Sequence, residues 1–119
     1  MNRKALIDAT VIGTALQLIM VLVGHWVPAV AALFAPIGIL ISLIAGLLYA
    51  RAAKGSWADS TLGGVLAGAL CALIGIAVSV ALGDVPAMIL VIGTLSSAAG
   101  GVVGGAIGKL LKSRLARSE

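Results

Sequence analysis

The chain has 119 residues, of which 61% are hydrophobic and only 10% are charged. A soluble domain of this length exposes too large a share of its area to hide so much apolar surface, so the composition excludes a soluble protein and indicates an integral membrane protein. The single cysteine, Cys71, excludes an internal disulfide, and the pI of about 9.9 does not indicate nucleic-acid binding, because the basic residues flank apolar segments.

Four apolar segments are each long enough to cross a bilayer, which takes about 20 residues in a helix. We expect transmembrane helices over about residues 5–23, 29–50, 60–82 and 87–108. The first two are separated by GHWVP and the last two by GDVP, each of which combines a glycine stop with a proline start. Proline is tolerated in a first helical turn because the N–H it lacks has no partner there. The expected fold class is therefore an all-α integral membrane protein, with one transmembrane domain over residues 1–119.

The basic residues are confined to alternate loops. Arg3 and Lys4 precede the first span, and Arg51 and Lys54 follow the second within the polar linker RAAKGSWAD. The other four follow the last span: Lys109, Lys112, Arg114 and Arg117. By the positive-inside rule, both termini and the middle loop are expected in the cytoplasm, with the spans in a prokaryotic inner or plasma membrane. The four basic residues of the tail, which is expected to continue as a helix, are predicted to contact anionic lipid headgroups on the cytoplasmic face.

The aromatic residues fit this topology. Trp26 is expected at the outer membrane interface, and Tyr49 and Trp57 at the inner one, because amphipathic rings concentrate there. An alternative for the N-terminus is a signal peptide, with a basic MNRK start and PAVA as a cleavage site. The internal repeat favours a first transmembrane helix instead, because it pairs the first span with the third.

The two halves of the chain show the same order of features. RKALIDATVIG and KGSWADSTLGG share a basic residue followed by Asp-x-Thr-x-x-Gly, so that Asp8 aligns with Asp59. Further on, Pro28 aligns with Pro86, and Arg51 with Lys109. We interpret this order as two duplicated hairpins, over about residues 1–54 and 55–119, although a biased composition can also align by chance. Both copies begin and end in the cytoplasm, which predicts a parallel repeat with a pseudo-twofold axis along the membrane normal.

Many of the 16 glycines form columns, since residues four apart share a helix face. The last span has two neighbouring columns, which we name by their ends: the 93–105 column (Gly93, Ser97, Gly101, Gly105) and the 96–108 column (Ser96, Gly100, Gly104, Gly108). The second span has a 38–50 column (Gly38, Ser42, Gly46, Ala50), which aligns with the 96–108 column in the repeat.

Small residues let two backbones approach closely, which favours helix association in lipid. We therefore expect the second and fourth spans to face each other through the 38–50 and 96–108 columns. The 93–105 column has no counterpart in the first copy, so it is expected to contact the third span, another subunit or a different protein. The alternative is that high Gly and Ala content produces such columns without a specific partner.

Few residues within the spans could carry chemistry. Asp8 and Asp59 begin helices, where a carboxylate favours the positive end of the helix dipole; a paired cation site is the alternative. Gln17, with Thr14 one turn away, is expected to form an interhelical hydrogen bond. The alternative is a polar path lined by Thr14, Gln17, Asp8 and Asp59. His25 is the only histidine and makes no metal site of three or four ligands. With no catalytic pair or cofactor motif, we expect no enzyme, no cofactor and no metal.

The segment GLLYARAAKGSWADSTLGGVLAG resembles the middle of small, glycine-rich, four-span prokaryotic membrane proteins in which a basic linker joins two hairpins. The chain does not resemble the small multidrug-resistance transporters of similar length, because its first span has no acidic residue beyond Asp8. The leading functional hypothesis is a protein that acts through helix packing, as a homo-oligomer or as an accessory subunit of a larger membrane complex. The alternatives are a small transporter or channel, with a path between repeats or subunits, and a holin-like permeabilising protein.

Overall fold

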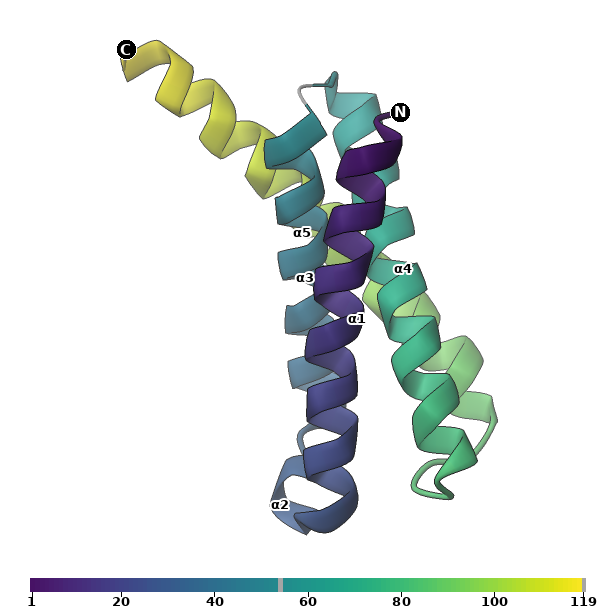
Figure 1. The fold of residues 1–119 in the computed structure, drawn as a ribbon. Coiled ribbons are helices and arrows are strands. Elements are labelled where there is room, and N and C mark those ends of the chain that lie inside the picture. The colour runs from purple at the N-terminus through teal and green to yellow at the C-terminus, as the bar shows by residue number, and fades with distance from the viewer. Residues whose placement is uncertain (54, 119) are drawn as a thin grey trace.

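The structure is a computed structural model that describes residues 1–53 and 55–118, with side chains up to residue 114. The described residues form helices and no strand (Figure 1): α1 (Arg3–Trp26), α2 (Pro28–Ala31), α3 (Phe34–Ala53), α4 (Trp57–Ala81) and α5 (Met88–Ser118). Four helices are long and apolar enough to cross a membrane, namely α1, α3, α4 and the part of α5 over Met88–Arg114. The expectation of an all-helical protein with four helices long and apolar enough to span a membrane is thus confirmed.

Local capping groups explain most helix boundaries. The side chain of Asn2 accepts a hydrogen bond from the Ala5 N–H at the start of α1, and Ser56 caps α4 in the same way. Pro28 is the first residue of α2, and Gly83 ends the turn after α4 with a φ of 78°, a conformation that glycine adopts without strain. The expected second span is divided, because the chain turns between α2 and α3. Gly24 does not stop α1, which continues to Trp26.

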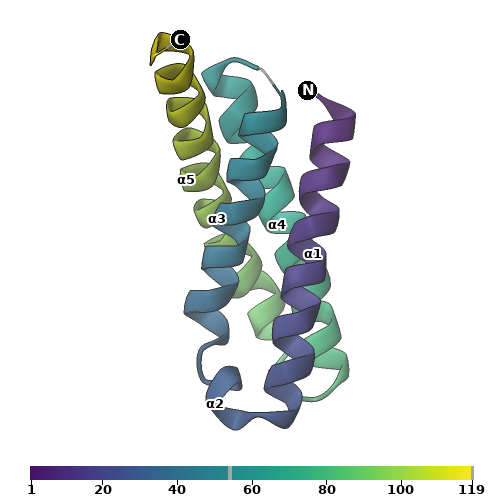
Figure 2. The same cartoon turned by 60° about the vertical axis from the view of Figure 1, so that its left-hand side comes forward.

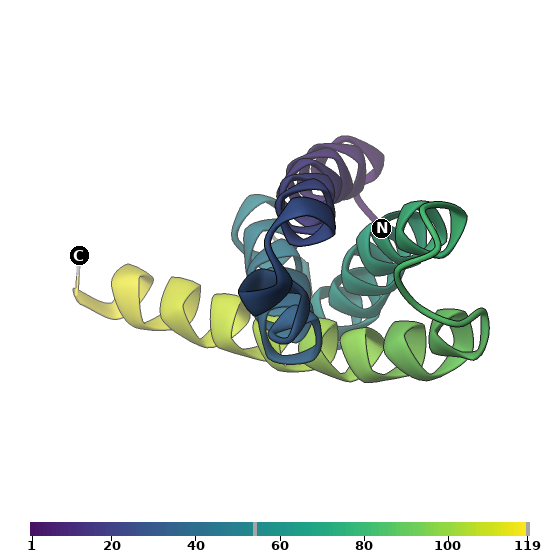
Figure 3. The same ribbon diagram turned by 90° about the horizontal axis from the view of Figure 1, so that it is seen from below.

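Helices α3 and α4 form the centre of the bundle, since each packs against both α1 and α5. Figures 2 and 3 show α1 and α5 on different sides of this central pair. Helix α5 crosses the bundle obliquely, so that its C-terminal half lies against α3 while its first turns lie beside α4 (Figure 1). As a result, α3 and α5 diverge toward one end of the molecule.

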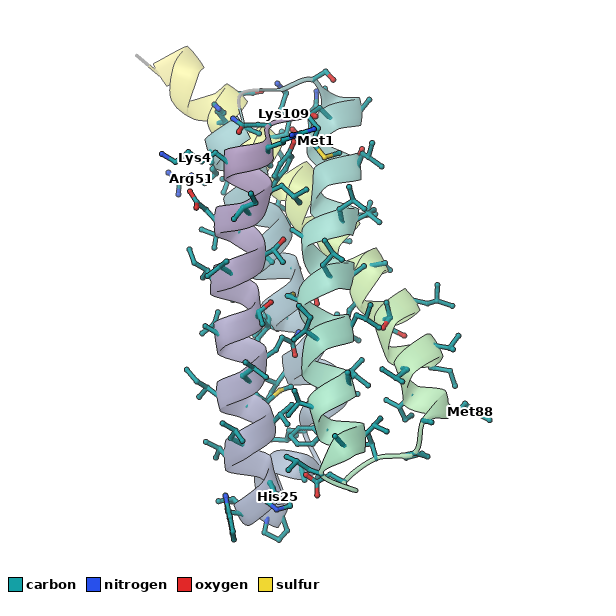
Figure 4. All side chains as sticks on the ribbon, turned by 45° about the vertical axis from the view of Figure 1, so that its right-hand side comes forward. Met1, Lys4, His25, Arg51, Met88 and Lys109 are labelled. Carbon is teal, nitrogen blue, oxygen red and sulfur yellow. The ribbon has the colours of Figure 1, made fainter. Side chains whose placement is uncertain are left out.

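The two ends of the bundle differ in charge. Both termini and the α3–α4 link lie at one end (Figure 1), and Figure 4 places Lys4, Arg51 and Lys109 there, with His25 at the other end. We call these the basic end and the opposite end. The positive-inside expectation requires the basic residues to gather at one end, as they do here. The orientation of the protein in a membrane stays a prediction. Lys54 and the side chain of Arg117 lie outside the part of the chain that the structure describes.

The interior is built mainly from small side chains. In the half toward the basic end, one buried cluster consists of Ala5, Ala9, Ala45, Tyr49, Ala67 and Cys71, and a second, in the other half, of Met20, Val21 and Ile41. Many of the larger apolar side chains point outward instead, including Ile7 (61% exposed) and Leu95 (67% exposed). Small residues inside and large apolar residues outside are the arrangement expected of helices that pack in lipid.

Candidate functional site

The 93–105 column of α5 lies against α4. A Cβ placed on Gly101 would collide with the Gly64 carbonyl, and one on Gly105 with the Ser60 carbonyl. Gly93, farther toward the opposite end, faces side chains rather than backbone, namely those of Ile76 and Ile89. Of the contacts that the sequence left open for this column, the structure shows the one with the third span.

The 96–108 column lies against α3, as expected for the second and fourth spans, but in a different register. Cβ atoms on Gly100 and Gly104 would meet the carbonyls of Ile39 and Leu43, which belong to the bulkier face of α3. A Cβ on Gly46 would meet Gly101 rather than Gly104, whereas one on Gly108 would meet Ala50 of the 38–50 column. The oblique course of α5 thus brings Gly101 of the 93–105 column against α3 as well as α4.

A buried polar cluster joins the two hairpins near the middle of the bundle. Gln17 Nε2 on α1 donates to the Gly38 carbonyl (3.2 Å) and to Ser42 Oγ (3.4 Å) on α3. Ser42 Oγ in turn donates to the Gly68 carbonyl of α4 (3.1 Å), and Cys71 Sγ lies 3.9 Å from both Gln17 Nε2 and Ser42 Oγ. The interhelical hydrogen bond predicted for Gln17 is therefore confirmed, and it is part of a three-helix network.

A wedge-shaped cavity of about 330 Å³ lies between this cluster and the opposite end. We call it the wedge. Its walls come from all five helices, and its exposed rim includes Ala35 and Ile39 on α3 and Ile92 and Ser96 on α5. Gly100 packs against the Ile39 carbonyl, and toward the opposite end α3 and α5 diverge (Figure 1). The wedge therefore opens sideways between α3 and α5.

Two polar groups of the wedge have unused hydrogen-bonding capacity. All three hydrogen bonds that Gln17 makes with described residues use Nε2, which leaves Oε1 as an acceptor. The Ser79 side chain is only 2% exposed, lines the wedge and has no hydrogen-bond partner among the described residues. No charged side chain is among the described residues that line the wedge. A buried hydroxyl without a partner is costly, so an external group that bonded Ser79 would gain from doing so.

The proposed polar path is only partly assembled. Thr14 Oγ1 is buried without a partner and does not line the wedge. Asp8 is exposed and lies beyond the first turn of α1, so the structure assigns the cap of this helix to Asn2 rather than to Asp8. Asp59 is in the first turn of α4, as expected. No cluster of three or more candidate metal ligands is found within residues 1–53 and 55–118.

Tyr49 and Asp59 close the basic end of the bundle. Tyr49, which is expected at the inner membrane interface, is fully buried within the bundle, because Gly63 leaves room for its ring. Its hydroxyl donates to Asp59 Oδ2 (3.0 Å) and accepts a hydrogen bond from the Asn2 N–H (3.3 Å). The amino group of Met1 lies 3.6 Å from Asp59 Oδ1. These contacts connect α1, α3 and α4 at the basic end.

His25 and Asp84 pair at the opposite end, a contact that the sequence analysis missed. His25 Nδ1 lies 2.9 Å from Asp84 Oδ2, so the end of α1 is attached to the turn between α4 and α5. The aligned turn prolines could have placed these two residues at the same end, although not in contact. Trp26 next to it is 79% exposed, as a residue of an interface belt would be.

Two of the basic residues that follow the last span also bind within the chain. Lys109 Nζ donates to the Gly55 carbonyl (2.6 Å) and Lys112 Nζ to the Arg51 carbonyl (3.1 Å). They therefore hold the α3–α4 link against α5. Contact of Lys109, Lys112 and Arg114 with lipid headgroups stays a prediction.

Comparison with known proteins gives no relative: no family model, curated protein or solved structure matches the chain.

Proposed function

We propose that this protein is a small membrane transporter whose substrate binds in the wedge between two hairpins, α1–α3 and α4–α5. The observation that supports this proposal is the wedge itself, a cavity of about 330 Å³ that reaches from the opposite end to Gln17. Its volume lies within the range of small-molecule sites. A site near the membrane midplane, between two structural repeats, is where many transporters bind their substrates.

The duplicated hairpin belongs to this proposal, because it would supply two similar bodies that move against each other. At positions that the repeat aligns, the two helices of each hairpin pack together through similar contacts. Gly13 packs against Ala45 between α1 and α3, and Gly64 packs against Gly101 and Gly105 between α4 and α5. Position 103, which the repeat aligns with Ala45, lies between those two glycines. Helices α1 and α5 pack differently against the central pair, and on this proposal the difference arose as the two copies diverged.

The distribution of contacts supports a state that is open at one end only. Tyr49 and Asp59 connect the hairpins at the basic end, and Gly46 and Gly101 bring α3 and α5 into backbone contact in the middle. Toward the opposite end α3 and α5 separate. In the proposed mechanism, the hairpins rock about the Gly46–Gly101 contact, which closes the wedge and loosens the contacts at the basic end.

The hypothesis of a homo-oligomer or accessory subunit has lost its main argument. It depended on the 93–105 column needing a partner, and that column is covered by α4 of the same chain. Oligomeric state and a partner protein stay predictions, and no described contact favours a holin-like activity over transport.

Spin labels on engineered cysteines test the motion. In a Cys71→Ser background, one pair is placed on α3 and α5 beside the wedge (Leu40→Cys with Leu95→Cys), where both side chains are exposed, 54% and 67%. A second pair, Ile7→Cys with Leu62→Cys, reports the basic end of α1 and α4. Pulsed electron–electron double resonance in lipid nanodiscs should show two distances between the spin labels of each pair. A single narrow distance for both pairs, under all lipid conditions, would reject a transporter.

A further inference from the structure

The wedge combines apolar walls with two polar atoms that the protein itself does not use. Phe34, Ile76 and Ile89 are among the wall residues, and none of the described lining residues carries a charge. A charged ligand would lose its hydration there without gaining a counter-ion. An uncharged ligand with an apolar body loses little and gains contact with the walls.

The positions of the polar atoms define the polar part of such a ligand. Gln17 Oε1 lies 3.5 Å from the position of a Cβ on Gly75, and Ser79 is one turn farther along the same face of α4. Both groups therefore belong to the same stretch of the wedge wall. A hydroxyl group is both a donor and an acceptor, so the hydroxyl of a ligand can donate to Gln17 Oε1 and accept from the Ser79 hydroxyl.

The volume limits the size of the ligand. A water molecule occupies about 30 Å³ in the liquid, so a cavity of about 330 Å³ holds a molecule of roughly ten non-hydrogen atoms. The sideways opening between α3 and α5 allows such a molecule to enter from the hydrocarbon of the bilayer.

We infer that the wedge binds an uncharged, single-chain amphiphile with a terminal hydroxyl group, of the size of a medium-chain alcohol, which enters from the bilayer and bonds Gln17 Oε1 and Ser79 Oγ. This inference builds on the proposed function, because it names the class of substrate for the same site. Binding and hairpin motion are nevertheless separate properties, and each can fail without the other.

The test is photolabelling of the full-length protein in nanodiscs with a diazirine analogue of 1-octanol, with the labelled residues located by mass spectrometry. Unlabelled 1-octanol, octane and octanoate compete at matched concentrations in the membrane. We expect labelling of wedge residues such as Phe34 and Ile76, strong competition by octanol, and weak competition by octane and octanoate.

Two variants on α4 separate hydrogen bonding from general packing. Ser79→Ala removes a hydroxyl that has no partner within the described protein, so the fold should be retained, and octanol should bind about 3- to 10-fold more weakly, as expected for one neutral hydrogen bond. Ser60→Ala is the matched control, because Ser60 is also buried and without a partner but does not line the wedge. Equal competition by octane and octanol, or equal octanol binding by the two variants, would overturn the inference. Spin-label distances that show motion without such selectivity would overturn the ligand class alone and leave the transporter proposal standing.

Discussion

Gly101 is a position at which a single added carbon should cost several kcal/mol of packing free energy. It lies where α3, α4 and α5 meet: a Cβ on Gly46, Gly64 or Gly68 would meet an atom of Gly101 at close range, and its own Cβ would meet the backbone of Gly64. Backbone atoms cannot rotate away as a side-chain tip can, so Gly101→Ala forces helices apart.

The size of the effect follows from two opposing contributions. Overpacking of a tight interior costs about 1–3 kcal/mol, and the obstacle at Gly101 favours the upper value. Replacing glycine by alanine within a helix stabilises the folded state by about 1 kcal/mol through helix propensity. We therefore expect Gly101→Ala to lower the free energy of unfolding by about 2 kcal/mol.

Gly93→Ala is the matched control from the same column. Its Cβ would lie 2.6 Å from the Cδ1 of Ile76, a flexible side-chain end that can move, so this change should be neutral or should stabilise by up to about 1 kcal/mol. Titration with SDS in mixed micelles, followed by circular dichroism, measures both free energies. Equal stabilities of the two variants would refute the close packing described for Gly101.

Gly101→Leu should destabilise further without changing the particle mass, and a smaller particle would instead reveal a contact between subunits.

Four further results are expected. Engineered cysteines at Arg51 should react with an impermeant reagent only from the cytoplasmic side and those at Gly83 only from outside, and the reverse would refute the positive-inside assignment. Tyr49→Phe should lower the free energy of unfolding by about 1–2 kcal/mol in SDS titration, because Asp59 and the Asn2 N–H lose a buried partner. Ser42→Ala should cost about 1 kcal/mol in the same assay through the lost link to α4. His25→Ala should change it by less than about 1 kcal/mol, because both side chains of this pair are partly exposed.

Hydropathy and charge position were sufficient to predict four spans and the clustering of basic residues, because both depend only on the chain order. The four-residue spacing of glycines also predicted which faces of α5 are in close contact. The register was not predictable. Gly46 meets Gly101 rather than Gly104 because α5 crosses α3 obliquely, and a crossing angle depends on every side chain along the contact.

The wedge could not be predicted from the sequence, since it results from the divergence of α3 and α5. Gln17 was identified as a buried polar residue. Its Oε1 is free because the neighbouring groups bond Nε2 instead, which the sequence does not show. Ser79 gave no signal, because a serine in an apolar helix usually bonds the carbonyl one turn before it. Tyr49 was placed at the interface by its residue type, and only the room beside Gly63 explains its burial.

The central claim is that ligand binding in the wedge biases two positions of the hairpins, and the most direct test measures both spin-label pairs with and without 1-octanol. A ligand that binds one state better must shift the populations toward it. Saturating octanol is expected to change the fraction of each distance for the Leu40–Leu95 pair and to shift the Ile7–Leu62 pair in the opposite sense. Unchanged distributions for both pairs, in a protein that photolabelling shows to be occupied, would contradict it.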